Sequence, residues 1–251
     1  GGVTGVQTCA LPISIGAGGA LLLARAAGVP VDVVFVTDGG SKGATAYGDS
    51  PEDVVEIRNR EAQQVCDRLG ATVHHLGIAN GRPAPTLEDL DRLSDLLERL
   101  QPATVLLPWI LDAPPRHRMV HHLLWLAHQR RALPDFEVWG FQVHNELLPN
   151  GYVDITTVAE EKRSLLACYR SQNEHIRRYD HLAMGLAAWN SRHVRDGGEA
   201  RFLEVFFTLP VAEHLRLVEQ FYFRSFTQTY RSVDAVAHPM EALHQIGRAH
   251  V

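Results

Sequence analysis

The sequence predicts one α/β domain of the Rossmann-like, doubly wound kind, with a mainly parallel sheet and helices on both faces. Runs of β-branched and apolar residues at 31–37 and 104–107 are typical of strands buried on both faces. Between them lie longer segments with helical spacing, such as 85–100 with its leucines. Alternation of strands with helices implies crossover connections and parallel neighbouring strands. The length, 251 residues, suits a single domain of this kind.

Each expected element has a local reason. Ser50 and Pro51 form a helix start, with an N-cap hydroxyl and a proline in the first turn. Gly28 and Gly70 each end a helical segment. We expect helices at 20–28, 51–69, 85–100, 117–130, 158–171, 181–191 and 211–221, and strands at 31–37, 72–76, 104–107, 136–144 and 202–208.

Composition narrows the choice of partners. The net charge of −5 and a pI near 6.3 give no electrostatic reason to expect nucleic acid or an anionic membrane surface as a partner. The longest apolar runs, 21–36 and 104–111, are interrupted and fall short of the ~20 residues of a membrane span. The three cysteines are odd in number and far apart, which favours reduced thiols and a cytoplasmic location.

The two ends of the chain do not match the rest. Residues 1–14 show no period of two or 3.6, and both GVQTCALPIS within them and QIGRAHV at 245–251 resemble translated sequencing-adapter text from assembled environmental DNA. We therefore expect a non-native segment at 1–14, a domain at 15–225 and a tail at 226–251 whose last seven residues are non-native. The alternative for residues 1–14 is an ordinary N-terminal strand.

A candidate site follows the strand at 104–107. The chain passes through Asp112, two prolines and Arg116, and reaches His117 at the start of a helical pattern. In open α/β sheets, ligands bind beyond the carboxyl ends of the strands. We therefore expect His117 to be a metal ligand and Asp112 its polar companion, with turn capping as the alternative role of Asp112.

Several motifs stand in the order of one known family. They are Gly16-Ala-Gly-Gly19 with its helix, Thr37-Asp38-Gly39-Gly40, Arg58-x-x-Glu61, Leu76-Gly77 with Asn80-Gly81, Pro108 with Asp112 and His117, and Lys162 with Tyr169-x-Ser171-Gln172. Over about residues 15–225, the chain resembles the LmbE-like, or PIG-L, metal-dependent de-N-acetylases. The resemblance implies hydrolysis of an N-acetyl group on an amino sugar or glycoconjugate, with zinc or another divalent metal.

The resemblance also exposes a gap at the front of the chain. Family members open with a strand that ends in His-Pro-Asp-Asp, in which the His and the second Asp bind the metal and the first Asp is the general base. Counted back from Gly16, the position of the His is Cys9, that of the general base is Leu11, and that of the second metal-binding Asp is Pro12. Leucine and proline can neither bind a cation nor take a proton. We therefore expect weak or absent metal binding, and no activity, in the chain as written.

The resemblance assigns further roles. His117 matches the third metal ligand, the final His of a frequent His-Pro-Asp-His motif, but Pro114 and Arg116 replace the His and Asp that come before it. Arg116 can supply positive charge to a developing oxyanion, with Asp112 as another group beside the metal ligand. Asp38 and Arg58 are expected to contact the substrate.

Other interpretations remain open. His121, one helical turn after His117, gives an HxxxH pattern that occurs with and without metal. His144 is expected to be structural or exposed. Arg58 and Glu61 can equally be a surface ion pair. At the level of function, the alternatives are a non-catalytic carbohydrate-binding relative and a nucleotide- or S-adenosylmethionine-binding domain. The latter rests on the glycines at 16–19, with Asp38 about 20 positions on.

Overall fold

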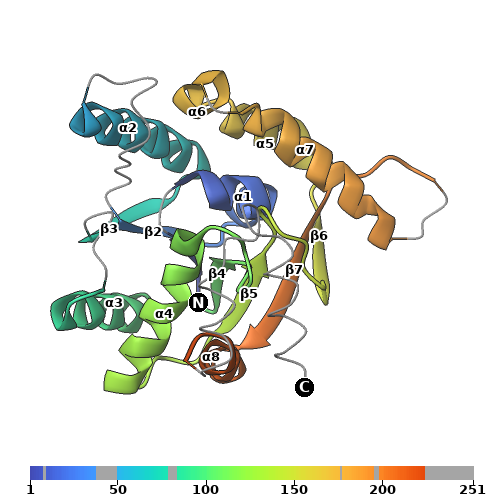
Figure 1. Cartoon of the computed structure of the whole chain (residues 1–251). Coiled ribbons are helices and arrows are strands. Elements are labelled where there is room, and N and C mark those ends of the chain that lie inside the picture. Colours follow the sequence, from blue (N-terminus) through green and yellow to red (C-terminus); the bar gives the residue numbers. More distant parts are fainter. Residues whose placement is uncertain (8–9, 38–49, 79–83, 176, 195–197, 224–251) are drawn as a thin grey trace, which may run out of the picture.

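The computed structural model describes residues 1–7, 10–37, 50–78, 84–175, 177–194 and 198–223. Its centre is a seven-stranded sheet with the strand order β3-β2-β1-β4-β5-β7-β6 (Figure 1). The pairs that join β3, β2, β1, β4 and β5 are parallel, whereas β7 is antiparallel to both β5 and β6. The strands are β1 Val3–Gln7, β2 Val31–Thr37, β3 Thr72–Ile78, β4 Thr104–Pro108, β5 Glu137–Phe141, β6 Gly151–Asp154 and β7 Leu203–Pro210. This confirms the expected fold class.

Most of the expected helices are present. They are α1 Ala10–Ala26, α2 Pro51–Leu69, α3 Leu87–Leu100, α4 Pro115–Arg130, α5 Ala159–Leu166, α6 Arg170–His175, α7 Tyr179–Asn190 and α8 Val211–Val218, with short turns η1 Thr156–Val158, η2 Ser191–His193 and η3 Glu219–Phe223. The Ser50 hydroxyl accepts a hydrogen bond from the backbone N–H of Asp53, as its N-cap position predicted. The single helix expected at 158–171 is instead two helices, α5 and α6.

At the front of the chain, the structure has the N-terminal strand that was the alternative for residues 1–14. Residues 3–7 form β1, which lies between β2 and β4 with Val3 opposite both Val31 and Thr104. Helix α1 also begins at Ala10, well before the expected segment at 20–28. The lack of a clear period in 1–14 did not exclude a strand there, because β1 contains a glycine and is paired with a neighbouring strand on each side. Gly5 allows α1 to pack close, since a Cβ there would overlap the Ile13 side chain.

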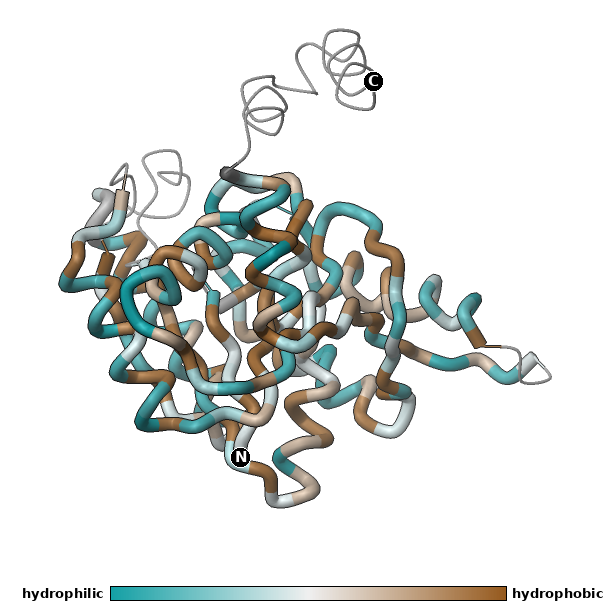
Figure 2. Tube along the Cα trace, turned by 90° about the horizontal axis from the view of Figure 1, so that it is seen from below, coloured by the Kyte–Doolittle hydropathy of each residue, from teal (hydrophilic) through white to brown (hydrophobic). Residues whose placement is uncertain are grey.

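Helices cover both faces of the sheet. In Figure 1, α1, α2, α5, α6 and α7 lie above it, and α3, α4 and α8 lie below it. The strands bury residues on both sides: Val33 and Phe35 of β2 contribute to the core under α1 and α2, and Val34 and Val36 to the core over α3 and α4. Hydrophobic and hydrophilic segments alternate along the helices, as Figure 2 shows, which is typical of helices with one buried face.

A buried ion pair joins α1 to α5 and β7. Lys162 and Glu204 are 1% and 3% exposed, and their side chains are 2.7 Å apart. The Lys162 ammonium also donates to the Ile15 carbonyl, while the Glu204 carboxylate accepts from the backbone N–H groups of Gly19 and Ala20. Ile15 and Gly19 are the carbonyl and N–H that pair in a regular α-helix. The Ile15 carbonyl therefore bonds to Lys162, and the Gly19 N–H bonds to Glu204.

Close packing of β5 and of the residue before η1 against α1 accounts for Gly16 and Gly19. A Cβ at Gly16 would meet Phe141 and the Gln142 carbonyl, and one at Gly19 would meet Ile155 at 2.6 Å. These glycines lie inside α1, whereas a dinucleotide fingerprint occupies the turn between strand and helix. The nucleotide-binding interpretation of this cluster is therefore wrong: the glycines permit close helix packing.

The cysteines and the apolar helices were the subject of two further expectations. Cys66 and Cys168 are buried free thiols, and burial raises the pKa of Cys66 to about 12, so neither is a reactive thiolate. Among the described helices, none combines the length and the apolar character that crossing a bilayer requires.

Candidate metal site

The candidate site lies beyond the carboxyl ends of β4 and β5. The Trp109 N–H donates to the Phe141 carbonyl, which ties the end of β4 to the end of β5, and the Asp112 N–H closes a turn on the Trp109 carbonyl. Asp112 is completely buried at the end of this turn. Pro115 then starts α4, whose first turn carries His117. The position agrees with the one expected from the sequence.

Asp112 holds the surrounding groups through both of its oxygens. Oδ2 lies 2.6 Å from Nδ1 of His117, and Oδ1 accepts from the backbone N–H groups of His144 and Asn145 at 3.1 and 3.0 Å. The Asn145 side chain donates in turn to the Leu111 carbonyl. The carboxylate therefore fixes the ring of His117 and the backbone of the loop after β5. Nε2 of His117 remains as the ring nitrogen that can bind a metal.

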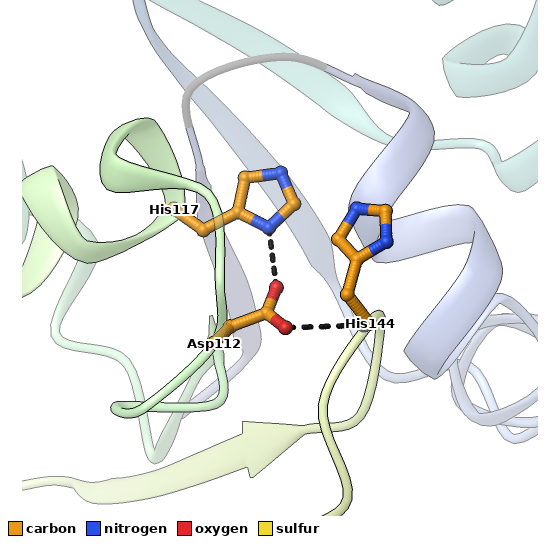
Figure 3. A group of neighbouring side chains, drawn as sticks. All are labelled: Asp112, His117 and His144. Carbon is orange, nitrogen blue, oxygen red and sulfur yellow. Dashed lines mark hydrogen bonds and ion pairs between the residues drawn. The ribbon is translucent and has the colours of Figure 1, made fainter. Parts of the chain in front are cut away.

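His144 completes a cluster that the sequence interpretation missed. Its ring stacks beside that of His117, with centroids 5.5 Å apart and planes at 26°, and both rings lie on the same side of Asp112 (Figure 3). One ligand atom each from Asp112, His117 and His144 lies within 4.8 Å of the others. Two imidazoles and a carboxylate are a donor set that suits zinc and other divalent transition metals. The residues present therefore fit a divalent metal.

The pKa shifts of Asp112 and His144 favour the protonation states that metal binding requires. Burial alone would raise the pKa of Asp112, but the hydrogen bond and charge of His117 and the N–H of Asn145 lower it below its ordinary value. Asp112 is thus ionised at neutral pH. Desolvation of the His144 ring lowers its pKa, and the charges of His117 and Arg177 add to this while Asp112 opposes it. A neutral imidazole is the form that binds a metal.

The slots at the front of the chain hold no ligand among the described residues. Leu11 is 6% exposed and belongs to the core under α1 and α2, and Pro12 is buried in the first turn of α1. Cys9 lies outside the described residues, as does Asp38, one of the expected substrate contacts. The general base and one ligand of the family pattern therefore have no counterpart at Leu11 and Pro12.

The two predicted arginines remain predictions. Arg116 is exposed at the start of α4, next to His117. Arg58 lies half-buried on α2. Glu61, its proposed surface partner, is instead 7% exposed, and it accepts hydrogen bonds from the N–H and hydroxyl of Ser171 at 2.7 and 2.8 Å. The Glu61–Ser171 contact thus links α2 to α6. It gives a structural reason for Glu61 and for Ser171 in their two family motifs.

His121 does not join the metal cluster. It is completely buried, and its Nδ1 lies 3.1 Å from Nε2 of His214 on α8. Burial lowers the pKa of both groups, that of His214 to about 4. His121 thus links α4 to α8, whereas the two histidines of the cluster come from the start of α4 and from the loop after β5.

The chain shows sequence similarity to known proteins. A protein-family model described as PIG-L, GlcNAc-PI de-N-acetylase, matches residues 13–128. A 4-oxalmesaconate hydratase from Pseudomonas putida is 28% identical over 183 residues, a match that covers 65% of this chain and 70% of the relative.

Solved structures of similar fold include both hydratases and deacetylases. The 4-carboxy-2-hydroxymuconate hydratase of Pseudomonas putida has a TM-score of 0.70 at 23% identity, covering 83% of this chain and 96% of the other. The N,N'-diacetylchitobiose deacetylase of Pyrococcus horikoshii has a TM-score of 0.67 at 22% identity, covering 83% of each chain. A deacetylase of teicoplanin biosynthesis has a TM-score of 0.64 at 15% identity, covering 84% of this chain and 98% of the other. These likenesses establish the shared fold.

Fold and cluster together define the class: an α/β protein with a possible metal site beyond its parallel strand ends. More specifically, residues 13–128 match the model of the PIG-L, or LmbE-like, family, which agrees with the motifs. Enzymes among its relatives are hydrolytic or lyase-like.

Proposed function

We propose that this chain has the site of a zinc-dependent hydrolase of the PIG-L deacetylase type, which removes the acetyl group from an N-acetylated amino sugar or glycoconjugate. The observation that carries the proposal is the Asp112–His117 pair. A carboxylate that fixes one ring nitrogen of a histidine and leaves the other to the metal is the usual partner of a metal-binding histidine.

Each residue has a distinct task in this proposal. The metal, when bound, lowers the pKa of water and polarises the carbonyl under attack. Asp112 keeps the His117 ring in place, and Arg116 offers positive charge to the oxyanion. Arg58 and Asp38 contact the sugar. Leu11 occupies the slot of the general base and takes no proton, so we expect the chain as written to lack turnover.

Two kinds of relative support the substrate class and the metal. Neighbours of similar fold include deacetylases named for diacetylchitobiose and for teicoplanin. One neighbour is the zinc-inhibited form of a teicoplanin deacetylase, at a TM-score of 0.59 and 16% identity. Neither the substrate nor the partner proposed for this chain includes nucleic acid.

A second candidate function is hydration of an unsaturated carboxylic acid. It is favoured by the 28% identical relative, which is a 4-oxalmesaconate hydratase. Both reactions require an activated water, which adds to a carbonyl in one case and to a carbon–carbon double bond in the other. The same cluster can therefore serve either reaction.

The test uses two proteins and two assays. One protein is the chain as written, and the other restores the family motif with Cys9→His, Ala10→Pro, Leu11→Asp and Pro12→Asp. Acetate release from N,N'-diacetylchitobiose reports deacetylation, and loss of ultraviolet absorbance of 4-oxalmesaconate reports hydration, each with zinc and after chelation.

We expect zinc-dependent acetate release from the restored protein alone. Zinc-dependent hydration without acetate release would favour the second candidate. Acetate release by the chain as written, above its chelated control, would contradict the role assigned to Leu11. A folded, zinc-loaded restored protein that is inactive in both assays would contradict the proposed function.

A further inference from the structure

We infer that this chain builds its metal centre from other residues than its family pattern implies: ring nitrogens of His117 and His144 bind the metal, Asp112 orients the His117 ring, and His144 replaces the lost first-strand donors. The inference rests on the proposed function only for the presence of a divalent metal. It concerns which side chains of this chain bind that metal.

The first step is the count of donors. The family pattern would leave His117 with ligands at Cys9 and Pro12, and Pro12 is a buried residue with no donor atom. Catalytic zinc usually has three protein ligands. The cluster beyond β4 and β5 restores a second ligand, the His144 imidazole, without any residue from the first strand.

The second step is geometry. Ligands of a tetrahedral zinc at ~2.0–2.2 Å lie about 3.5 Å from one another. The candidate atoms of the cluster already lie within 4.8 Å. His144 is exposed, so its side chain has room to rotate towards the His117 ring, whereas Asp112 and His117 are buried.

The third step concerns the hydrogen bonds that fix the loop after β5. The backbone N–H groups of His144 and Asn145 both donate to Oδ1 of Asp112, and the Asn145 side chain is held by the Leu111 carbonyl. The loop that carries His144 is therefore fixed at its backbone to the same carboxylate that orients His117. This backbone attachment keeps the His144 side chain beside the His117 ring.

The test measures zinc affinity by calorimetry and the rise in melting temperature with zinc. The variants are His144→Ala, His117→Ala and Cys9→Ser. The matched control is His75→Ala, because His75 is an exposed histidine on β3, separated from β5 by three strands in the sheet order. Melting curves without zinc show whether each variant folds.

We expect the unaltered chain to bind one zinc, and His144→Ala and His117→Ala each to weaken binding by at least ~10-fold. Cys9→Ser and His75→Ala should bind zinc as the unaltered chain does. If His117→Ala weakens binding while His144→Ala behaves like the His75 control, the ligand set is overturned but a metal at His117, and with it the proposed function, stands. If the unaltered chain binds no zinc, the centre itself is overturned.

Discussion

The ion pair between Lys162 and Glu204 makes a strong prediction about stability. The Glu204 carboxylate accepts three hydrogen bonds, from Lys162 and from the N–H groups of Gly19 and Ala20, and all lie at 2.7–2.8 Å. Glu204→Gln keeps the shape of the side chain but removes its charge. The buried Lys162 ammonium then loses its counter-ion, and three donors face a neutral amide with a single acceptor oxygen.

The expected loss is large because an unpaired charge stays buried. Removing one partner of a buried pair typically costs ~3–5 kcal/mol, against a total of about 5–15 kcal/mol for a domain. Urea unfolding followed by circular dichroism measures the loss, and with a slope of ~2–3 kcal/mol/M the midpoint should fall by about 1–2.5 M. The double variant Lys162→Met/Glu204→Gln should lose less than the two single variants together, because no charge is left behind.

Two results would refute this reasoning. One is a Glu204→Gln protein within ~1 kcal/mol of the unaltered chain, which is the size of an ordinary neutral hydrogen bond. The other is full additivity of the two single variants, which would mean that the side chains do not interact.

Three further predictions address other parts of the structure. Glu61→Ala should lower the free energy of unfolding by about 2–3 kcal/mol through its lost bonds to Ser171, whereas Glu56→Ala, on the exposed face of α2, should change it by under ~0.5 kcal/mol in the same urea assay. His214, whose pKa is lowered to about 4 by burial, binds a proton more readily when unfolded, so stability present above pH ~6.5 should decline by up to roughly 3 kcal/mol towards pH 4; unchanged stability over that range would refute it. Asp112→Asn should weaken zinc binding by ~10–100-fold, and calorimetry showing unaltered affinity would deny Asp112 any role at the metal.

Local signals in the sequence were enough for much of the fold. β2 and β4 were expected almost to the residue, because strands buried on both faces consist of continuous apolar runs. Helix α2 was expected in full, because Ser50 and Gly70 mark its ends. β1 could not be found in this way: it is five residues long and contains a glycine, and its neighbours in the sheet hold it in place.

The candidate site was predictable only in part. Asp112 and His117 could be expected because they follow a recognisable strand in the order of a known family. His144 comes 32 residues after Asp112, and its role depends on the distance between two loops, which no local pattern reports. The expected strand at 136–144 also ends at Phe141, so His144 lies in a loop where the sequence suggested a strand.

The central claim is that a metal centre persists beyond the ends of β4 and β5 although the first-strand ligands are lost. A crystal of the zinc-soaked protein, with anomalous data on both sides of the zinc absorption edge, tests it most directly. We predict a single strong anomalous peak ~2.0–2.2 Å from ring nitrogens of His117 and His144, beside the carboxylate of Asp112. A peak bound elsewhere, or no peak at that place in a protein that remains folded, would contradict the claim.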